Sequence, residues 1–293
     1  MDKFNELFAQ YNWQMTDEQV KQEVKNILDA HFRENNNPAV WKQCLNQIDL
    51  TTLNGDDTVE KVSTMAKHVN EFHTQFPDIP NVAAICVYPA MVSTVRENLK
   101  EPVGIAAVSA GFPASQTFIE VKVAETLLAI QAGATEIDVV ISIGKFLEGR
   151  YQEVYDELCE LREACKAPVH MKVILETGAL RGVKNIYNAS LLAMQAGADF
   201  IKTSTGKIAV NATPEATYVM CRAIKDWYGK TGIKVSYKPA GGVSTTEEAV
   251  QHFTIVKHVL GEDWLNNSNF RFGASRLANN LLTSIVGQEV KYF

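Results

Sequence analysis

From residue 48 onward, short hydrophobic runs alternate with longer stretches of helical periodicity. The runs are rich in β-branched residues and bounded by turn residues, which is typical of buried strands. Eight strands are predicted, at residues 48–52, 83–88, 104–110, 136–142, 169–176, 200–205, 234–240 and 270–275. Helices are predicted in the intervals, at residues 58–76, 90–100, 115–132, 151–166, 184–196, 214–228, 245–259 and 275–286.

Eight strands that are each followed by a helix predict an α/β fold of the (β/α)8 TIM barrel type. Gly133 and Gly197 stand where a helix ends before the next strand, as expected of a C-terminal glycine. An open doubly wound sheet is the alternative, but no GxGxxG turn follows its first strand. The chain of 293 residues has a suitable length for one barrel domain, predicted at residues 47–293.

Residues 1–46 are predicted to form a helical N-terminal extension. Thr16 and Gln19 have the spacing of a capping box. One helical face then carries Val20, Val24, Ile27, Leu28 and Phe32. Residues 35–38 (NNNP) end that helix, and residues 39–47 favour a second short one. We expect the extension to pack on the barrel or on another subunit.

Composition narrows the class of partner and the compartment. A net charge of −6 and a pI near 5.6 argue against nucleic-acid or membrane-surface partners. No stretch is apolar for 18 residues, and the N-terminus has no signal-peptide pattern. Five scattered cysteines without CxxC spacing fit reduced thiols. We therefore expect a cytoplasmic protein.

Charged residues interrupt the predicted strands about one βα unit apart. They are two acids and three lysines: Asp49, Asp138, Lys172, Lys202 and Lys238. A single one of them would be read as a structural ion pair, whereas five together indicate an active site inside the barrel.

Two of these lysines, Lys202 and Lys238, lie on adjacent predicted strands. A lysine attacks a carbonyl only when it is unprotonated, and burial beside another ammonium lowers its pKa toward the useful range. One lysine can therefore be the nucleophile and the other its activator, and this pattern leaves the assignment open.

Three late turns are rich in small residues and predict a phosphate site. They lie at residues 206–207, 239–243 and 272–276.

Metal catalysis is the alternative for a carbonyl substrate. Of six histidines only His170 lies in a predicted strand, and no HxH or HExxH pair occurs. The lysine mechanism is the better supported of the two.

Seven segments, in order, resemble the deoxyribose-phosphate aldolase family. They are residues 49–54 (DLTTLN), 83–89 (AAICVYP), 136–140 (EIDVV), 172–178 (KVILETG), 200–207 (FIKTSTGK), 238–242 (KPAGG) and 271–275 (RFGAS). The resemblance implies a class I aldolase that needs no metal or other cofactor. Such enzymes reversibly cleave 2-deoxy-D-ribose 5-phosphate to D-glyceraldehyde 3-phosphate and acetaldehyde, and they form homodimers or homotetramers.

Carried over by position, the resemblance makes Lys202 the Schiff-base lysine and Lys238 the neighbour that lowers its pKa. Asp138 becomes the acid/base and Lys172 the residue that holds it. The expected substrate-binding residues are Asp49, Cys86, Thr205, Gly206, Lys207, Gly241, Gly242, Gly273, Ser275 and Arg276. Cys86 matches a thiol near the site, and the role of a small buried hydrophobic residue is favoured for it.

The chain departs from the family pattern at three positions. Ser244 stands where bacterial members carry Arg, and Arg276 stands where they carry Ser. We hypothesise that the phosphate-binding guanidinium has moved from one loop to the other. Tyr292 is the penultimate residue, whereas the family's C-terminal tyrosine is the last. Its help in proton transfer is a hypothesis.

Two other functions are alternatives for such a chain. A keto-acid or ketose-phosphate aldolase would share the lysine and phosphate chemistry, without a reason to carry these motifs together. An inactive sugar-phosphate-binding barrel would be expected to have lost some of the five charged strand residues, and all five are present.

Overall fold

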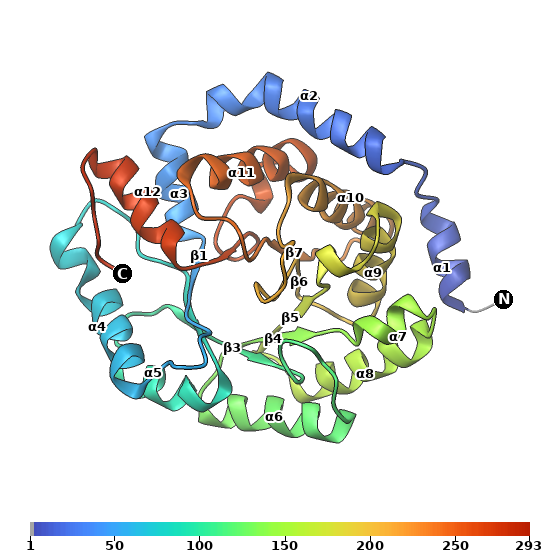
Figure 1. Ribbon diagram of the computed structural model, residues 1–293, viewed down its shortest axis with the longest axis horizontal. Helices are drawn as coiled ribbons and strands as arrows, with labels where there is room; N and C mark the ends of the chain where they lie inside the picture. The colour runs from blue at the N-terminus through green and yellow to red at the C-terminus, as the bar shows by residue number, and fades with distance from the viewer. Residues whose placement is uncertain (1–2) are drawn as a thin grey trace.

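The computed structural model describes residues 3–293, in which eight strands form a parallel barrel (Figure 1). Neighbouring strands follow the order β7-β6-β5-β4-β3-β2-β1-β8, and two bridges, Tyr237 to Phe270 and Ala240 to Gly273, connect β7 to β8. The predicted (β/α)8 fold is therefore confirmed. The strands are β1 (Ile48–Thr51), β2 (Ala84–Val87), β3 (Gly104–Ser109), β4 (Glu136–Val140), β5 (His170–Ile174), β6 (Phe200–Lys202), β7 (Ser236–Lys238) and β8 (Phe272–Ala274).

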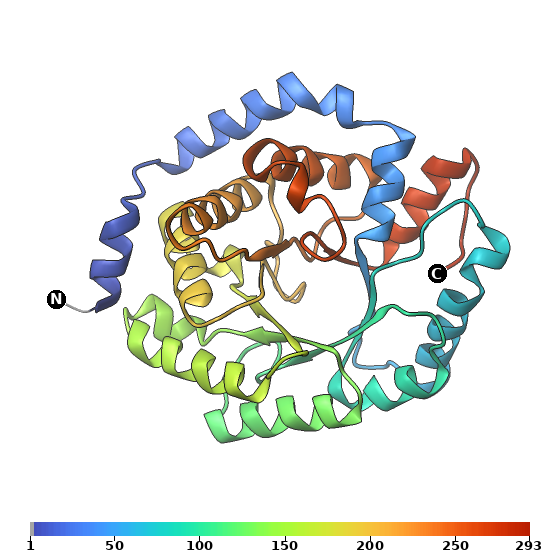
Figure 2. The ribbon, with the colours of Figure 1, turned by 180° about the vertical axis from the view of Figure 1, so that it is seen from behind.

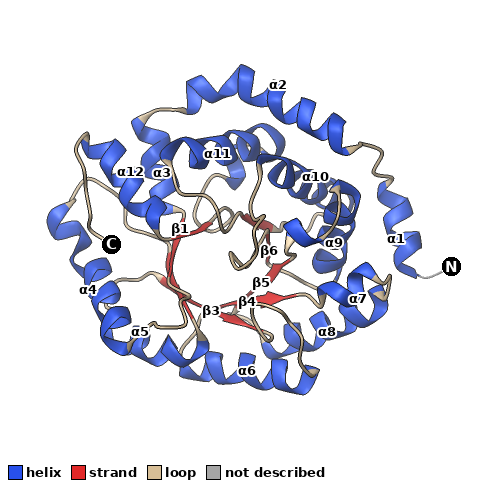
Figure 3. Cartoon of the chain, in the orientation of Figure 1, coloured by secondary structure: helices blue, strands red, loops and turns tan. Residues whose placement is uncertain are grey.

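Helices surround the strands in a ring (Figure 3). The barrel helices are α4 (Val59–Gln75), α5 (Val92–Asn98), α6 (Ile119–Ala132), α7 (Ile143–Leu147), α8 (Tyr151–Ala164), α9 (Val183–Gln195), α10 (Pro214–Thr231), α11 (Thr246–Leu260) and α12 (Arg276–Val286). The main hydrophobic core lies between the two layers, because both faces of a parallel sheet are covered. The ring leaves the carboxyl ends of the strands free to carry loops.

Several strands end earlier than predicted, and the polar residues that follow them form side-chain hydrogen bonds to neighbouring loops. The strand predicted at residues 200–205 ends at Lys202. Beyond it, the Thr203 hydroxyl donates to the Ala240 carbonyl at 3.2 Å and accepts from the Ala240 N–H at 2.9 Å. These residues therefore build the loop that carries the site.

Three helical features differ from the prediction. The helix α7 was not predicted, and α6 begins at Ile119 rather than at residue 115. Ser115 has φ of 57° and is bonded through its hydroxyl to the Val140 carbonyl, which holds it in a loop. The helix α1 (Lys3–Tyr11) was also missed; its aromatic residues contact distant ones, in the pairs Phe4–Tyr155, Phe8–Tyr151 and Tyr11–Trp227.

The N-terminal extension wraps around the outside of the barrel helices (Figures 1 and 2). It consists of α1, α2 (Asp17–Asn35) and α3 (Pro38–Asn46), and the predicted capping box at Thr16 and Gln19 is confirmed. Asp17 accepts a hydrogen bond at 3.0 Å from the N–H of Val183, the first residue of α9. Because the N-cap Gly182 has no side chain, the extension caps this barrel helix. Residues 1–2 of the predicted extension lie outside the described residues, and the boundary near residue 46 stays a prediction.

No helix within residues 3–293 is long and apolar enough to cross a membrane.

Candidate active site

The five charged strand residues meet in the barrel interior, where each is at most 2 % exposed. Asp138 is the centre: its Oδ2 lies 2.7 Å from the Nζ atoms of both Lys202 and Lys238. Its Oδ1 lies 3.1 Å from Lys172 Nζ. Asp49 joins from β1, 2.5 Å from Lys238 and 3.3 Å from Lys172. Five strands thus contribute to one buried ion-pair network.

The three lysines of this network differ in their pKa. Burial lowers the pKa of Lys202, and the Lys238 ammonium adds to this, so that together they outweigh the opposite effect of Asp138. Burial also acts to lower the pKa of Lys172 and of Lys238, but the carboxylates of Asp138 and Asp49 outweigh it and raise both. Lys202 is therefore the lysine that loses its proton most easily.

The Asp138 carboxyl remains ionised. Burial acts to raise its pKa, but Lys172, Lys202 and Lys238 hold it well below the ordinary value. A carboxylate that accepts from amines on three strands is fixed in place, which suits it to proton exchange with a bound substrate.

Two further charged residues belong to the network, and the sequence reasoning missed them. Arg271 lies 2.6 Å from Asp49 and 3.1 Å from Glu136, and Glu136 also forms an ion pair with Lys172. Glu136 precedes Asp138 by two positions on β4, so the alternation along a strand places both on one face. That alternation was the signal available in the sequence.

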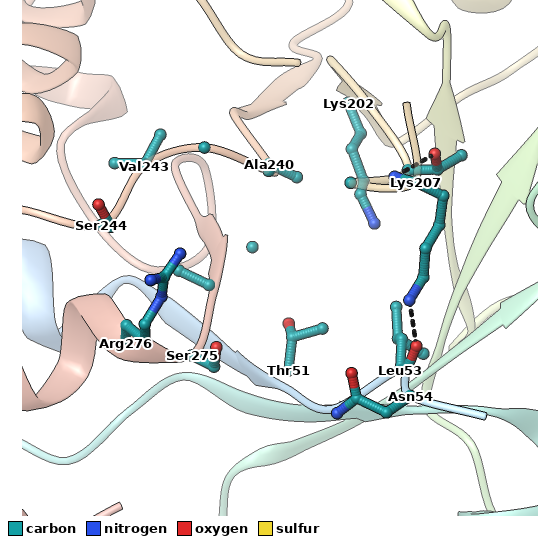
Figure 4. Close-up of a pocket in the computed structure, with 16 residues that line it drawn as sticks. Thr51, Leu53, Asn54, Lys202, Lys207, Ala240, Val243, Ser244, Ser275 and Arg276 are labelled. Carbon is teal, nitrogen blue, oxygen red and sulfur yellow. Dashed lines mark hydrogen bonds between the residues drawn. The ribbon is translucent and has the colours of Figure 1, made fainter. Parts of the chain in front are cut away.

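A pocket of about 210 Å³ opens above this network at the carboxyl ends of the strands (Figure 4). Of the five network residues named first, Lys202 lines it, while the other four lie buried beneath. The predicted turns supply most of the wall, namely Thr205, Gly206, Lys207, Gly241, Gly242, Gly273, Ser275 and Arg276. The structure therefore places the predicted phosphate residues and the predicted nucleophile around one cavity.

Two predicted binding residues do not line this pocket. Asp49 is fully buried among its ion pairs. Cys86 is fully buried in a small apolar cluster with Leu53, Ala106 and Val108, and burial raises the pKa of its thiol. Cys86 lies below the pocket as a small buried residue.

Gly273 shows why small residues occur in these turns. A Cβ atom there would lie 2.7 Å from Ala240 Cβ and 3.1 Å from Cε of Lys238. The first distance is a clash, so any side chain would push the neighbouring turn or the Lys238 stem out of place.

Thr205 is held by a residue that was not predicted. The Glu176 carboxylate accepts from the Thr205 hydroxyl at 2.6 Å and from its N–H at 3.2 Å. The Thr205 hydroxyl accepts in turn from the N–H of Lys207 at 3.1 Å. The Lys207 ammonium donates to the Leu53 carbonyl along one side of the pocket (Figure 4). Glu176 is 2 % exposed and therefore shapes this turn from inside.

Arg276 lies at the start of α12, on the side of the pocket opposite Lys202 and Lys207 (Figure 4). Its neighbour in the wall is Ser244, whose N–H and hydroxyl donate to Glu248 at 2.8 and 3.2 Å. Arg276 is thus the arginine that reaches the region between the late turns.

Tyr292 lies away from the wall of this pocket. Its hydroxyl donates to the His68 carbonyl at 2.7 Å, and its ring packs with Phe72, Phe76 and Phe293. Its help in proton transfer stays a hypothesis, and in this conformation the hydroxyl is already bonded elsewhere.

Within residues 3–293 no group of three or more His, Cys, Asp or Glu residues could hold a metal ion.

Residues 44–260 match the sequence model of the DeoC/LacD family aldolases. The chain belongs to this family. Deoxyribose-phosphate aldolase of Homo sapiens is 44 % identical over 245 residues, covering 80 % of this chain and 77 % of that protein. The enzyme of Mus musculus is 44 % identical over 250 residues, with the same coverage of 80 % and 77 %. The resemblance drawn from the sequence motifs is therefore confirmed.

A solved structure has the same fold. It is described as the unique tetrameric structure of deoxyribose phosphate aldolase from Aeropyrum pernix, and it has a TM-score of 0.67 at 23 % identity. The match covers 89 % of this chain and 97 % of the other. Family membership makes the chain an aldolase, while the roles of individual residues are proposed below.

Proposed function

We propose that this aldolase cleaves 2-deoxy-D-ribose 5-phosphate reversibly to D-glyceraldehyde 3-phosphate and acetaldehyde. The observation that carries this proposal is Lys202, which combines a lowered pKa with access to a pocket walled by the predicted phosphate turns. The relatives of Homo sapiens and Mus musculus named above support the choice of substrate.

In the proposed reaction, the neutral Lys202 amine attacks the aldehyde carbon C1 of the open-chain sugar. Loss of water gives an iminium ion, which draws electrons from the C2–C3 bond. As that bond breaks, the C3 hydroxyl loses its proton and the electron pair forms an enamine. Protonation of C2 and hydrolysis of the imine release acetaldehyde and free the Lys202 amine.

The neighbours of Lys202 have separate roles in this proposal. Asp138, 2.7 Å from its Nζ, exchanges protons with the substrate through a water molecule. Lys238 contacts the same carboxylate oxygen and keeps Lys202 from holding its proton. Lys172 holds the other oxygen of Asp138.

The phosphate is proposed to bind at the late turns, with Arg276 as its guanidinium. Ser244 occupies the wall beside it and donates a hydrogen bond to Glu248. Because its side chain is uncharged, Ser244 supplies no cation for the phosphate. Lys207 and the backbone of Gly241 and Gly242 complete the site. A guanidinium binds phosphate by two parallel hydrogen bonds, which suits Arg276 to this role.

Trapping tests the nucleophile. The chain is incubated with acetaldehyde, reduced with borohydride and mapped by peptide mass spectrometry. We expect a two-carbon adduct on Lys202, and loss of that adduct in Lys202→Arg. An adduct on Lys238 instead would reverse the two roles, and binding of phosphate ligands with no adduct would indicate an inactive barrel.

We also propose that the chain forms a homo-oligomer through α6. This helix turns Lys122 and Thr126 inward and exposes apolar residues instead. Phe118, just before it, is 78 % exposed, and Val121, Leu127 and Leu128 are 51, 49 and 64 % exposed. A second copy is the occupant proposed for this face, because an exposed patch dominated by apolar side chains is buried favourably against the same patch of another copy. The tetrameric structure from Aeropyrum pernix is in keeping with assembly.

A cytoplasmic location is proposed from the cysteines. All five are free, and four of them are buried. Thiols that stay unpaired fit a reducing compartment. Cell fractionation of the tagged chain in its source organism would test the proposal.

A further inference from the structure

We propose that Glu136 and Arg271 set the protonation state of Lys202 from the far side of the buried network. They are positioning residues: neither lines the pocket, and each acts through a chain of ion pairs that ends at Asp138, the carboxylate that contacts Lys202. The inference rests on the proposed role of Lys202 as the Schiff-base lysine.

A continuous chain of ion pairs connects the two residues to Lys202. Arg271 lies 2.6 Å from Asp49, which lies 2.5 Å from Lys238. Lys238 and Lys202 share one oxygen of Asp138, each at 2.7 Å. The second route begins at Glu136, which pairs with Lys172, and Lys172 bonds the other oxygen of that carboxylate at 3.1 Å.

The network contains one more cation than anions when every group is charged. The four cations are Lys172, Lys202, Lys238 and Arg271, and the three anions are Asp49, Glu136 and Asp138. An uncompensated charge in a buried site is costly, and loss of one proton removes it. The arrangement therefore favours three positive and three negative charges, with one amine neutral.

The number of carboxylate contacts selects which amine becomes neutral. Lys172 contacts Asp49, Glu136 and Asp138, and Lys238 contacts two carboxylates. Lys202 contacts Asp138 alone. Arginine keeps its proton in proteins, so Arg271 cannot supply the neutral group. Lys202 therefore gives up its proton, and Glu136 and Arg271 fix the balance that makes it do so.

Other titratable groups around the network are few among the described residues. Cys86 on β2 and Asp138 and Lys238 on β4 and β7 face Lys202, and Lys207 shares its pocket. His170 at the start of β5 interacts with Glu136 and Lys172 from outside, and it lies 3.8 Å from Asp199. Asp138 and Lys238 are themselves members of the network, whereas Cys86, Lys207 and His170 form no ion pair with any of its seven residues.

Removing the Glu136 charge and removing the Arg271 charge shift the net charge of the network in opposite directions. Glu136→Gln leaves four cations against two anions, which makes protonation of Lys202 less favourable. Arg271→Gln leaves three cations, counting Lys202, against three anions, so that Lys202 keeps its proton to higher pH. The double variant restores the surplus of a single cation. A purely structural role would give no such difference in sign.

The test measures the pH at which Lys202 becomes reactive in each variant. The folded protein is pulse-labelled with acetic anhydride across a pH series, and the acetylated fraction of Lys202 is read by peptide mass spectrometry. This readout needs no turnover, so it stays valid if the proposed substrate is wrong.

We expect the labelling midpoint to move down by about one pH unit in Glu136→Gln and up by about one unit in Arg271→Gln. The double variant should return toward the wild-type midpoint, and Arg271→Lys should stay near it. If Arg271→Gln does not fold, the downward shift in Glu136→Gln decides the question. Shifts in the same direction, or no shift in folded variants, would overturn the proposal.

Discussion

The Nζ atoms of Lys202 and Lys238 both lie 2.7 Å from a single oxygen, Oδ2 of Asp138. The two lysines are register partners on β6 and β7, so the barrel holds them side by side. Two ammonium groups on one carboxylate oxygen repel each other, and Lys202 has no second carboxylate to compensate. This relationship is the physical reason for proposing Lys202 as the nucleophile.

Replacing Lys238 by Met should lower turnover at neutral pH by about 100-fold or more. Without the second ammonium the pKa of Lys202 rises, so a smaller fraction of Lys202 is neutral at pH 7. Part of the activity should therefore return as the pH is raised, which a pH profile of kcat would show. Lys238→Arg is the matched control that keeps the charge. Activity within threefold of wild type in Lys238→Met would contradict the assigned role.

Replacing Arg276 by Ala should lower kcat/KM for 2-deoxy-D-ribose 5-phosphate by about 10- to 100-fold. The same change should have little effect on unphosphorylated 2-deoxyribose, because the lost contact is to phosphate. Steady-state kinetics with both substrates gives the comparison. The exchange Ser244→Arg with Arg276→Ser should restore part of the loss. An equal loss with the two substrates would rule out a phosphate role for Arg276.

Replacing Leu128 by Glu should break the proposed contact between copies of the chain. The new charge would be buried against an apolar face, which is costly. Light scattering after size-exclusion chromatography should then give a mass near the 32.5 kDa of one chain. Lys100→Glu, an exposed change just after α5, is the control and should keep the wild-type mass. An unchanged oligomer in Leu128→Glu would place the interface elsewhere.

Stability should fall with acid in a way that depends on His252. This ring is buried beside Thr217, 2.6 Å from its hydroxyl, and burial lowers its pKa to about 4. The unfolded chain therefore binds the proton first, so the stabilisation is present above about pH 6.5 and is lost as the pH falls toward 4. The expected loss is about 3 kcal/mol.

Urea unfolding at pH 7 and pH 4.5 measures this loss. His252→Gln should be less stable than wild type at pH 7 but should lose less stability on acidification. His73→Gln, at an exposed position of α4, is the control and should behave as wild type does. A wild-type pH dependence in His252→Gln would show that other groups cause the acid sensitivity.

Much of the fold and the site followed from local sequence pattern. Short β-branched runs and helical periodicity are consequences of neighbouring residues, so they predicted the eight βα units. The charged residues Asp138 and Lys202 were recognisable because charge is rare inside a buried strand. The small residues of the late turns were recognisable for a similar reason, since backbone can approach a ligand closely there.

Other features of the site were decided only by the tertiary structure, because they depend on contacts between residues that are distant in the sequence. Arg271 and Asp49 are 222 positions apart, and Glu176, which follows β5, bonds Thr205, which follows the neighbouring β6. The family resemblance had pointed to Lys202, but the physical reason for proposing Lys202 rather than Lys238 as the neutral amine required the barrel. Residue type alone gave two equal lysines, and the number of carboxylates that closure of the barrel brings to each one separates them. Buried electrostatics depends on distance through space, which sequence spacing does not contain.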